Sequence, residues 1–418
     1  MILKLARKSL WNRRGTAILT LVSLAISVAL ILGINHLRLQ AKESFTSTLS
    51  GTDLIVGARS GATNLLLYSV FHIGNATNNI SWQSYEAIAG QRQVDWTIPI
   101  SLGDSHRGFR VVGTDQNYFE HYRYGEARKL EFAGGAPFTG VFDTVLGAQV
   151  ARELGYAIGD EIVIAHGLGD VSFSKHDDKP FTVTGILEPT GTPVDRSVHV
   201  KLEGIEAIHI DWRHGAKMPG RGVSAQEALL ADLEPKAITA FLVGLKSRMA
   251  TFTLQRQIND YRKEALTAIL PGVALAELWD VLGMVENMLI VVAFLVLLAT
   301  LVGMTTTLLS SMKERQRELA ILRAVGAHAG YLFALIEIEA LLLAFVGVVL
   351  GILLLWLSLL MLQPWLASHF GLFIAANPLN AEAFWICGGV LLLAALLALF
   401  PALIAYRRTL VDGLGVRL

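Results

Sequence analysis

An uncharged apolar run near the N-terminus decides the class of fold: GTAILTLVSLAISVALILGIN, residues 15–35. A helix needs about 20 predominantly apolar residues to cross the hydrocarbon core of a membrane. Three further runs meet this length, at residues 287–312, 340–362 and 383–406. Soluble core helices rarely run this long without a charge, so the four runs predict four transmembrane helices rather than buried core helices.

The composition agrees with a chain that lies partly in a membrane and partly in water. Apolar residues make up 53% of the 418 residues and charged residues only 17%, whereas soluble domains carry about 25% charged residues. This excludes a disordered chain and an ordinary soluble enzyme. The formal net charge of zero gives no reason to expect a nucleic-acid partner. The single cysteine, Cys387, excludes an intrachain disulfide and a cysteine-based zinc cluster.

The first apolar run could also belong to a cleaved signal peptide. It is longer than the apolar region of about 7–15 residues that signal peptides carry. The sequence HLRLQ that follows, residues 36–40, contains no convincing small-x-small cleavage site. We therefore expect an uncleaved anchor helix.

Lysine and arginine flank the predicted spans unequally, and the flanks rich in them face the cytoplasm. Residues 1–14 contain five basic residues and no acidic one. Segment 313–328 contains four basic residues and the tail 407–418 three, whereas segment 363–382 contains none. Both termini and segment 313–328 are therefore predicted to be cytoplasmic, and segment 363–382 to lie outside.

The predicted fold is an integral membrane α-helical protein with four transmembrane helices in a 1+3 order. A large α/β (α+β) domain is inserted between the first and second helices, on the periplasmic side of a bacterial inner membrane. The helices on both sides of it continue without a strong breaker, which predicts stalk helices. The predicted segments are a cytoplasmic N-terminus 1–14, span 15–36, periplasmic domain with stalks 37–286, span 287–312, cytoplasmic helix 313–328, span 329–362, periplasmic loop 363–382, span 383–406 and cytoplasmic tail 407–418.

Short runs of β-branched residues in the outer segment, bounded by Gly, Pro or Asp, are typical of strands. A short helix over residues 149–155 is expected to end at Gly155. Residues 251–266 predict an amphipathic helix with Leu254, Ile258 and Tyr261 on one face. The predicted strands are 53–56, 109–112, 161–164, 181–184 and 197–200.

The outer segment gives little reason to expect catalysis or a metal. It contains neither a G-x-S-x-G elbow nor an H-E-x-x-H motif. A zinc site needs three or four converging ligands, and the spacing of the histidines shows no convergence, so we predict solvated loops and no metal site. The residues that keep a minor metal hypothesis open are His166, His176, Asp177, Asp178, His199, His209, Asp211 and His214.

A short charged stretch, MKERQRELAILRAVGA at residues 312–327, lies between the second and third predicted spans. Leu319, Leu322 and Val325 can share one face of a helix, and Gly326 can end it. From the residues alone, this helix could lie in the membrane interface with its long basic side chains extended toward water.

The same stretch resembles the FtsX/MacB/LolC-type permeases of ABC transporters, the mechanotransmission or type VII class. Their signature is close to E-R-x-x-E-[IL]-[AG]-x-[LM]-[RK]-A-[ILV]-G-A, and ERQRELAILRAVGA at residues 314–327 is similar almost throughout. Glu339-Ala340 and Pro401-Ala402 resemble further family motifs. The outer segment resembles the MacB-like periplasmic core, for example at GTDLIVG, residues 51–57, and VTGIL, residues 183–187.

The resemblance implies a non-catalytic subunit that works with a separate ATPase. The chain has no G-x-x-x-x-G-K-[ST] loop, so ATP and Mg²⁺ are expected on the partner chain and no cofactor on this one. Segment 313–328 would be the coupling helix in a groove of that ATPase, with charged residues setting the register and leucines anchoring it. The implied coupling residues are Glu314, Arg315, Glu318, Leu319, Leu322, Arg323 and Gly326.

Family members act as permease dimers, so the resemblance implies a homodimer or a pairing with a paralogous permease. Small residues every four positions let membrane helices approach closely. The candidates for the dimer interface are Ala25, Ala29 and Gly33 in the first span, and Gly347 and Gly351 in the third. Two acidic residues in the third predicted span, Glu337 and Glu339, favour an interfacial role over a proton or substrate site.

The implied function is conversion of ATP hydrolysis into conformational work in the periplasm, for export or extraction of a lipoprotein, peptide or other hydrophobic cargo. A periplasmic or outer-membrane partner protein would fit this function. The alternative is an FtsX-like transmitter that controls a periplasmic partner, although about 250 outer residues favour cargo handling. A membrane-anchored periplasmic enzyme would need a catalytic constellation that the sequence does not show.

Overall fold

The computed structural model describes residues 10–11, 13–166, 177–213, 216–217, 223–314, 321, 326–370, 375 and 377–411. The chain divides into two compact units. The first, here called the helical unit, consists of Met1–Ala41, Leu282–Pro364 and Ile374–Leu418. The second, the α/β unit, consists of Lys42–Val281 and Trp365–Phe373.

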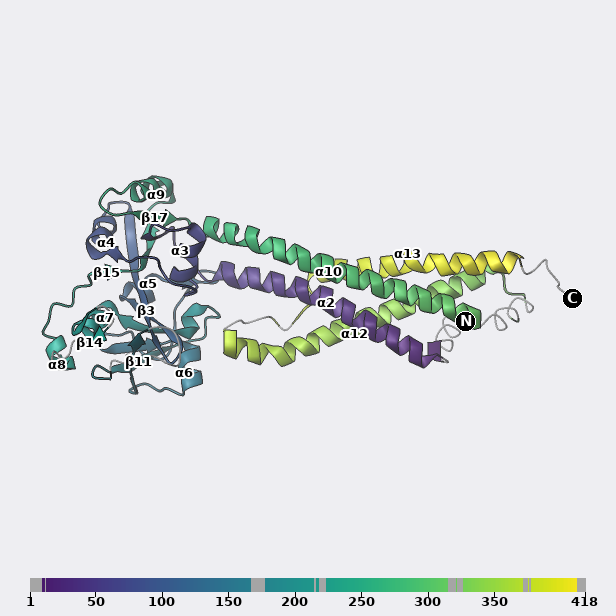
Figure 1. Ribbon diagram of the computed structural model, residues 1–418, viewed down its shortest axis with the longest axis horizontal. Coiled ribbons are helices and arrows are strands. Elements are labelled where there is room, and N and C mark those ends of the chain that lie inside the picture. Colours follow the sequence, from purple (N-terminus) through teal and green to yellow (C-terminus); the bar gives the residue numbers. More distant parts are fainter. Residues whose placement is uncertain are drawn as a thin grey trace. The chain divides into compact units, whose positions relative to one another are not determined.

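The helical unit is built on four long helices: α2 (Arg14–Ser47), α10 (Pro271–Glu314), α12 (Ala329–Phe370) and α13 (Ala381–Val411). Among the described residues, four helical stretches are long and apolar enough to cross a membrane: Arg14–Glu43, Pro271–Met312, Gly330–Gln363 and Ala381–Ile404. The prediction of four apolar helices is therefore confirmed. One of the helices precedes the strands of the α/β unit in the chain and three follow them (Figure 1).

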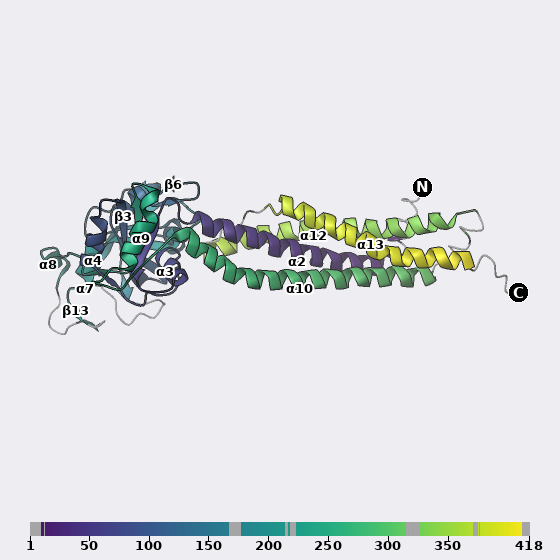
Figure 2. The ribbon, with the colours of Figure 1, turned by 90° about the horizontal axis from the view of Figure 1, so that it is seen from above.

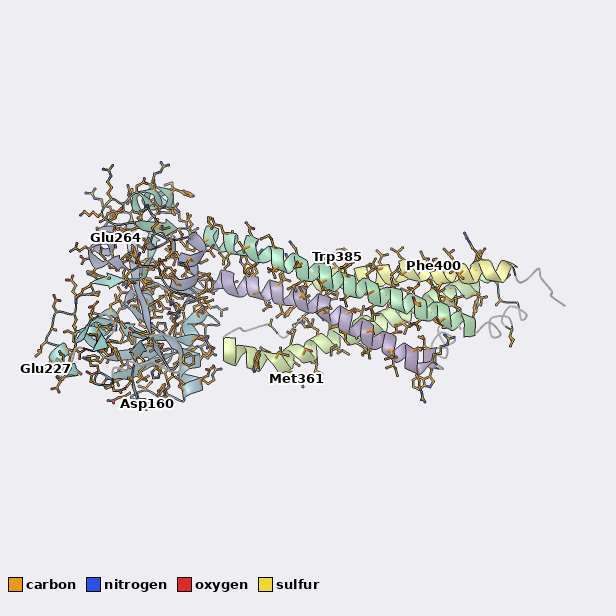
Figure 3. All side chains as sticks on the ribbon, in the orientation of Figure 1. Asp160, Glu227, Glu264, Met361, Trp385 and Phe400 are labelled. Atoms are coloured by element: carbon orange, nitrogen blue, oxygen red, sulfur yellow. The ribbon has the colours of Figure 1, made fainter. Side chains whose placement is uncertain are left out.

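Large apolar side chains project outward from these helices, which suits a lipid environment. Figure 3 shows Met361 on α12 and Trp385 and Phe400 on α13, each pointing away from the helix that carries it. All three are largely exposed. A water-soluble bundle would bury such side chains, because apolar area exposed to water raises the free energy of the fold.

Two of the helices extend well beyond their uncharged apolar runs. Helix α2 continues to Ser47 without interruption. Helix α10 begins at Pro271, a residue suited to the first turn because its missing N–H would have no partner inside the helix. Both helices are continuous where the sequence shows no strong breaker.

The α/β unit contains one large mixed sheet with helices on it. In chain order its elements are β1 (Leu54–Ala58), α3 (Ala62–Ser69), β2 (Ile80–Ser81), α4 (Trp82–Ala89), β3 (Val94–His106), β4 (Phe109–Thr114), α5 (Asn117–His121), β5 (Arg123–Tyr124), β6 (Arg128–Lys129), β7 (Phe132–Gly135), β8 (Asp143–Leu146), α6 (Ala148–Leu154), β9 (Glu161–Ile162), β10 (Ala165–His166), β11 (Phe181–Leu187), η1 (Pro193–Arg196), β12 (Ser197–Lys201), α7 (Leu202–His209), β13 (Trp212–Arg213), β14 (Ala216–Lys217), α8 (Ala225–Ala228), β15 (Ala237–Ile238), β16 (Ala240–Leu245), η2 (Arg248–Ala250), α9 (Thr251–Asn259) and β17 (Leu266–Ile269). The mixed α/β texture and four of the five predicted strands are confirmed. Of the predicted strand 161–164, only Glu161–Ile162 is a strand.

The long strand β3 joins the two halves of the sheet, whose order is β17-β1-β16-β3-β4-β12-β8-β11-β7. The first part of β3 pairs antiparallel with β16, and its last part pairs antiparallel with β4. The register shifts between Leu102 and Ser105. Gly103 lies in this shift with φ near 157°, so one continuous strand turns from one half of the sheet into the other.

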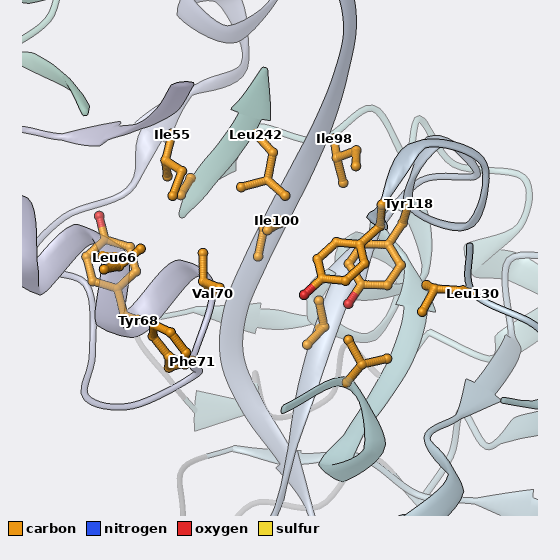
Figure 4. Packing of buried hydrophobic residues seen from close by; sticks show 14 of the residues in the cluster. Ile55, Leu66, Tyr68, Val70, Phe71, Ile98, Ile100, Tyr118, Leu130 and Leu242 are labelled. Atoms are coloured by element: carbon orange, nitrogen blue, oxygen red, sulfur yellow. The ribbon is translucent and has the colours of Figure 1, made fainter. Parts of the chain in front are cut away.

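Alternating side chains of the central strands build two cores on opposite faces of the sheet. Leu54 and Val56 of β1 pack with Leu254 and Ile258 of α9. Ile55, between them, packs on the other face in the cluster shown in Figure 4. That cluster includes Leu66 and Tyr68 of α3, Ile98 and Ile100 of β3, and Tyr118 of α5.

The predicted helix over residues 251–266 is wrong in its second half. Helix α9 ends at Asn259 and strand β17 begins at Leu266. The Asn259 side-chain oxygen accepts a hydrogen bond from the backbone N–H of Ala268 at 2.7 Å. An asparagine that bonds a returning backbone favours a helix end over another turn. The other predicted helix is confirmed as α6, and Gly155 caps it with φ +72°.

Candidate functional site

The segment between α10 and α12 is described only at its ends. Helix α10 ends at Glu314, and Ile321 is helical and exposed. Gly326 lies in a turn with φ +101°, in the left-handed region that glycine adopts at little cost, and α12 begins at Ala329. The remaining predicted coupling residues lie outside the described residues: Arg315, Glu318, Leu319, Leu322 and Arg323.

Helices α2 and α10 run antiparallel and make polar contacts at three levels. Arg13 Nη2 donates to the Ser311 carbonyl at 2.6 Å. The hydroxyls of Ser27 and Thr300 lie 2.8 Å apart in the middle of the apolar stretches. Near the other end, Arg38 Nε lies 3.2 Å from Glu286 Oε2. Both views show the two helices lying next to each other along their length (Figures 1 and 2).

The small residues predicted at helix interfaces lie at a close contact between α2 and α12. A Cβ on Gly347 would lie 2.5 Å from Leu24, and one on Gly351 would lie 2.8 Å from Val28. A Cβ on Gly33 would lie 3.3 Å from Leu355. Ala25 is buried and its carbonyl faces Gly351, whereas Ala29 is half-buried. These contacts are within one chain, so the dimer role of these five residues stays a prediction.

A small, partly open cavity lies where the segment before and at the start of α2 meets the C-terminal part of α10 and the N-terminal part of α12. Its volume is about 20 Å³. Glu339 of α12 contributes a carboxylate that is only 3% exposed. Glu339 is thus buried among helices, a position that its sequence context alone did not specify. The other lining residues are Leu10 and Arg13 before α2, Thr16, Ala17 and Thr20 at the start of α2, Thr307, Leu308 and Ser311 on α10, and Leu343 on α12.

At the other end of α2, two side chains bind the backbone of one residue between α12 and α13. His36 Nε2 lies 2.8 Å from the carbonyl oxygen of Ala375. The backbone N–H of Ala375 donates to Gln40 Oε1 at 3.0 Å. Sequence reasoning missed both contacts, because the partners are more than 300 positions apart in the chain.

Several of the acidic residues and histidines that kept the metal hypothesis open have structural partners. Lys179 Nζ lies 2.9 Å from Asp211 Oδ1 in an ion pair, and both side chains are fully buried. His209 Nε2 lies 3.8 Å from Asp104. Within the described part of the chain, no group of three His, Cys, Asp or Glu residues is arranged to hold a metal ion. His176 and His214 lie outside the described residues.

A serine–histidine contact lies at the edge of the core, and its serine hydroxyl is buried and already bonded. His72 Nδ1 lies 2.9 Å from Ser197 Oγ, but that hydroxyl also donates to the Pro193 carbonyl and Ser197 is buried. Burial lowers the pKa of His72 to about 3 and that of His199 to about 4. Both imidazoles are therefore neutral near pH 7, and His199 is fully buried in the core.

The surface of the α/β unit exposes a few large apolar side chains. Leu230, Met249 and Phe252 are 89%, 91% and 72% exposed. Leu230 follows α8, whereas Met249 and Phe252 lie at the start of α9. Exposed apolar side chains of this size are typical of surfaces that contact other molecules.

Comparisons with known proteins match both parts of the chain. The family model of the MacB-like periplasmic core domain matches residues 17–261. The family model of the FtsX-like permease C-terminal region matches residues 290–411. No curated protein gives a significant match to the sequence.

Solved structures of related regions are similar to about half of the chain. One is the crystal structure of the periplasmic region of MacB from Actinobacillus actinomycetemcomitans. It is 11% identical with a TM-score of 0.33, over 55% of this chain and 94% of that one. Another is the crystal structure of the extracellular domain of the noncanonic ABC-type transporter YknZ from Gram-positive bacteria, 13% identical with a TM-score of 0.31, over 52% and 99%.

The family models, rather than these distant structural similarities, carry the assignment. The periplasmic core model covers more than half of the chain, and the permease model covers the last two apolar helices and the C-terminal part of the one before them. The chain therefore belongs to the FtsX/MacB-type permeases of ABC transporters.

Proposed function

We propose that this permease transmits the work of a separate ATPase to its α/β unit on the outer side of a bacterial inner membrane. The observation that carries the proposal is the continuity of α2 and α10. Each is one uninterrupted helix that includes a membrane-spanning stretch and whose terminal residues belong to the α/β unit, up to Ser47 in α2 and from Pro271 in α10. A continuous helix passes an axial or tilting displacement along its length, as rigid-body transitions require.

The proposed topology has four spans in a 1+3 order, with the α/β unit in the periplasm and both termini in the cytoplasm. The basic residues before α2 and after α10 support this orientation. Alkaline phosphatase fused after Leu418 should then be inactive, and phosphatase inserted between Leu229 and Leu230 should be active. The reverse pattern would contradict the topology.

The proposed coupling site is the segment between α10 and α12, with contacts from Glu314, Arg315, Glu318, Leu319, Leu322 and Arg323. Gly326 supports it, because its left-handed turn ends the segment just before α12 begins. ATP and Mg²⁺ would be bound by the ATPase subunit. Families of this kind pair a non-catalytic permease with an ATPase; the homodimer, or pairing with a paralogous permease, is part of this proposal.

The proposed work is export or extraction of a lipoprotein, peptide or other hydrophobic cargo. Leu230, Met249 and Phe252 support contact with an apolar cargo or a periplasmic partner, since each is exposed on the α/β unit. The size of that unit favours cargo handling over the alternative of an FtsX-like signal transmitter. In proteoliposomes with the ATPase, release of cargo would support the first, whereas ATPase turnover that only activates a periplasmic partner would support the second.

The coupling assignment is tested by co-purification of the ATPase with the full-length permease. Arg315→Ala/Glu318→Ala should abolish association while membrane insertion stays intact. Gln316→Ala/Arg317→Ala changes neighbouring residues of the same segment that are not assigned a contact, and should leave association unchanged. Normal co-purification of the Arg315→Ala/Glu318→Ala variant would remove the basis of the assignment.

A further inference from the structure

The side chain of Arg13 binds the C-terminal end of α10. Its Nη2 donates to the Ser311 carbonyl at 2.6 Å. Ser311 lies in the last turn of α10 that the structure describes, since the described helix ends at Glu314. Hydrogen bonds from a charged donor are roughly twice as strong as neutral ones, so this bond fastens the residue just before α2 to that turn of α10.

Arg13 also lines the cavity that contains the Glu339 carboxylate. Its volume of about 20 Å³ leaves room for roughly one water molecule. Among the described residues that line it, Arg13 carries a positive charge and Glu339 a negative one. A buried carboxylate among apolar helices is costly without an opposite charge near it, so a guanidinium in the same lining is favourable for Glu339.

We propose that Arg13 is a positioning residue that fastens α2 to both helices that flank the coupling segment. It holds α10 through the Ser311 carbonyl and α12 through the Glu339 carboxylate. The inference rests on the proposed coupling function, because its consequence is mechanical. A displacement of segment 313–328 moves the end of α10 and the start of α12, and Arg13 makes α2 follow them.

The test uses the close contact between α2 and α12 as a reporter. The parent variant carries Cys387→Ser, which removes the native thiol, together with Leu24→Cys and Gly347→Cys. A Cβ on Gly347 would lie 3.1 Å from the Cβ of Leu24, so the two introduced thiols are close to each other. Disulfides join Cβ atoms about 3.5–4.5 Å apart, and the cysteine at position 24 removes the bulk that would clash. The rate of disulfide formation is followed by thiol alkylation in the full-length permease in nanodiscs.

Arg13→Ala and Glu339→Gln should each slow disulfide formation about fivefold or more, the factor that a contact of about 1 kcal/mol contributes. Glu339→Gln keeps the size and shape of the side chain and one of its two acceptor oxygens, and it removes the negative charge. Arg14→Ala is the matched control, because it removes the same charge from the next, exposed residue. It should leave the rate unchanged.

Charge reversal distinguishes pairing from a general packing defect. Arg13→Glu and Glu339→Arg should each slow the reaction, and the double variant should recover most of the rate because opposite charges face each other again. Unchanged rates in Arg13→Ala and Glu339→Gln, or a double reversal as slow as the slower single variant, would overturn the proposal. If a variant fails to insert, Arg13→Lys serves instead, since it keeps the charge and should stay near the parent rate.

The measurement uses the permease without the ATPase. If the proposed role of Arg13 is wrong, Arg13→Ala and Glu339→Gln will leave the disulfide rate unchanged, while the ATPase still co-purifies with the unaltered permease. A failed coupling assignment would appear as normal co-purification of Arg315→Ala/Glu318→Ala, whatever the disulfide rates are.

Discussion

Gly351 of α12 packs directly on Val28 of α2. A Cβ on the glycine would lie 2.8 Å from the Val28 Cβ and 2.9 Å from the Ala25 carbonyl oxygen. These distances are shorter than ordinary van der Waals contact, so one added methyl group would push the two helices apart. The absence of a side chain at this position is what allows the helices to meet.

Gly351→Ala should destabilise the helical unit by about 1–3 kcal/mol, the usual cost of overpacking a close contact. Gly347→Ala should cost less, because the atoms that it meets belong to the Leu24 side chain, which can shift. Thermal unfolding of the purified protein in detergent measures both effects.

Gly303→Ala is the matched control for this series. Gly303 is also in an apolar helix, but a Cβ there meets no atom within 4 Å among the described residues. Alanine should be neutral or slightly stabilising at this position, because it has the higher helix propensity. Equal losses of stability in Gly303→Ala and Gly351→Ala would contradict the steric explanation.

Lys179→Met should destabilise the α/β unit by about 3–5 kcal/mol, because it leaves the buried Asp211 carboxylate without its ammonium partner. Lys179→Met/Asp211→Leu should recover much of this loss, since no isolated charge then remains. Denaturant or thermal unfolding of the full chain, followed by tryptophan fluorescence, provides the measurement.

Lys236→Met serves as the comparison for this ion pair. Lys236 lies 3.8 Å from Glu206, but its side chain is largely exposed. Exposed ion pairs contribute about 0–1 kcal/mol, so this variant should be close to wild type. A double variant at Lys179 and Asp211 that is no more stable than Lys179→Met would show that packing, rather than charge, sets the cost.

The buried histidines should make stability depend on pH below neutrality. Burial lowers the pKa of His199 to about 4 and of His72 to about 3, against about 6.5 in an unfolded chain. The unfolded state therefore binds more protons as pH falls below 6.5. Stability is fully present above that pH and is lost as pH falls toward the folded pKa values, by up to about 1.4 kcal/mol per pH unit for each histidine.

The variant His199→Gln removes the contribution of His199 to this pH dependence. The comparison is needed because burial raises the pKa of Asp115 to about 7, and this carboxyl acts in the opposite direction over the same pH range. As the pH falls from 6.5 to 4, the wild type should lose more stability than His199→Gln does. Parallel stability curves for the two proteins would show that His199 does not titrate on unfolding.

Gly326→Val should impair the turn before α12, because φ +101° is strained for a β-branched residue. A Cβ there meets no described atom within 4 Å, so the effect comes from backbone conformation rather than from a clash. With strain of about 1–3 kcal/mol, co-purification of the ATPase should weaken at least several-fold. Ala327→Val, at a neighbouring position, should bind normally, and equal binding by both variants would place the turn outside the coupling mechanism.

Much of the α/β unit could be predicted from local sequence. The strand prediction at residues 53–56 is confirmed by β1, because a short continuous apolar run bounded by turn-forming residues is typical of a strand buried on both faces. The helix prediction over 251–266 was wrong beyond Asn259. The bond from Ala268 that favours this end comes from a strand further along the chain, which periodicity cannot reveal.

The site was less predictable than the fold. The motif at residues 314–327 indicated a coupling segment, and the described turn at Gly326 has the conformation that a stop requires. The spacing of Gly347 and Gly351 indicated a close helix contact but not its partner. Arg13 was read only as one of several basic residues that set orientation, because a bond to Ser311 spans almost 300 positions.

The sequence by itself determined four apolar helices, the order of the parts along the chain and the asymmetry of charge across the predicted spans. These properties follow from local transfer energies, since a run of apolar residues favours lipid whatever the rest of the chain does. The tertiary structure decided which side chains meet: Gly351 with Val28, Lys179 with Asp211, and Arg13 with Ser311. Each of these contacts depends on how distant segments return to one another, and that is a property of packing rather than of composition.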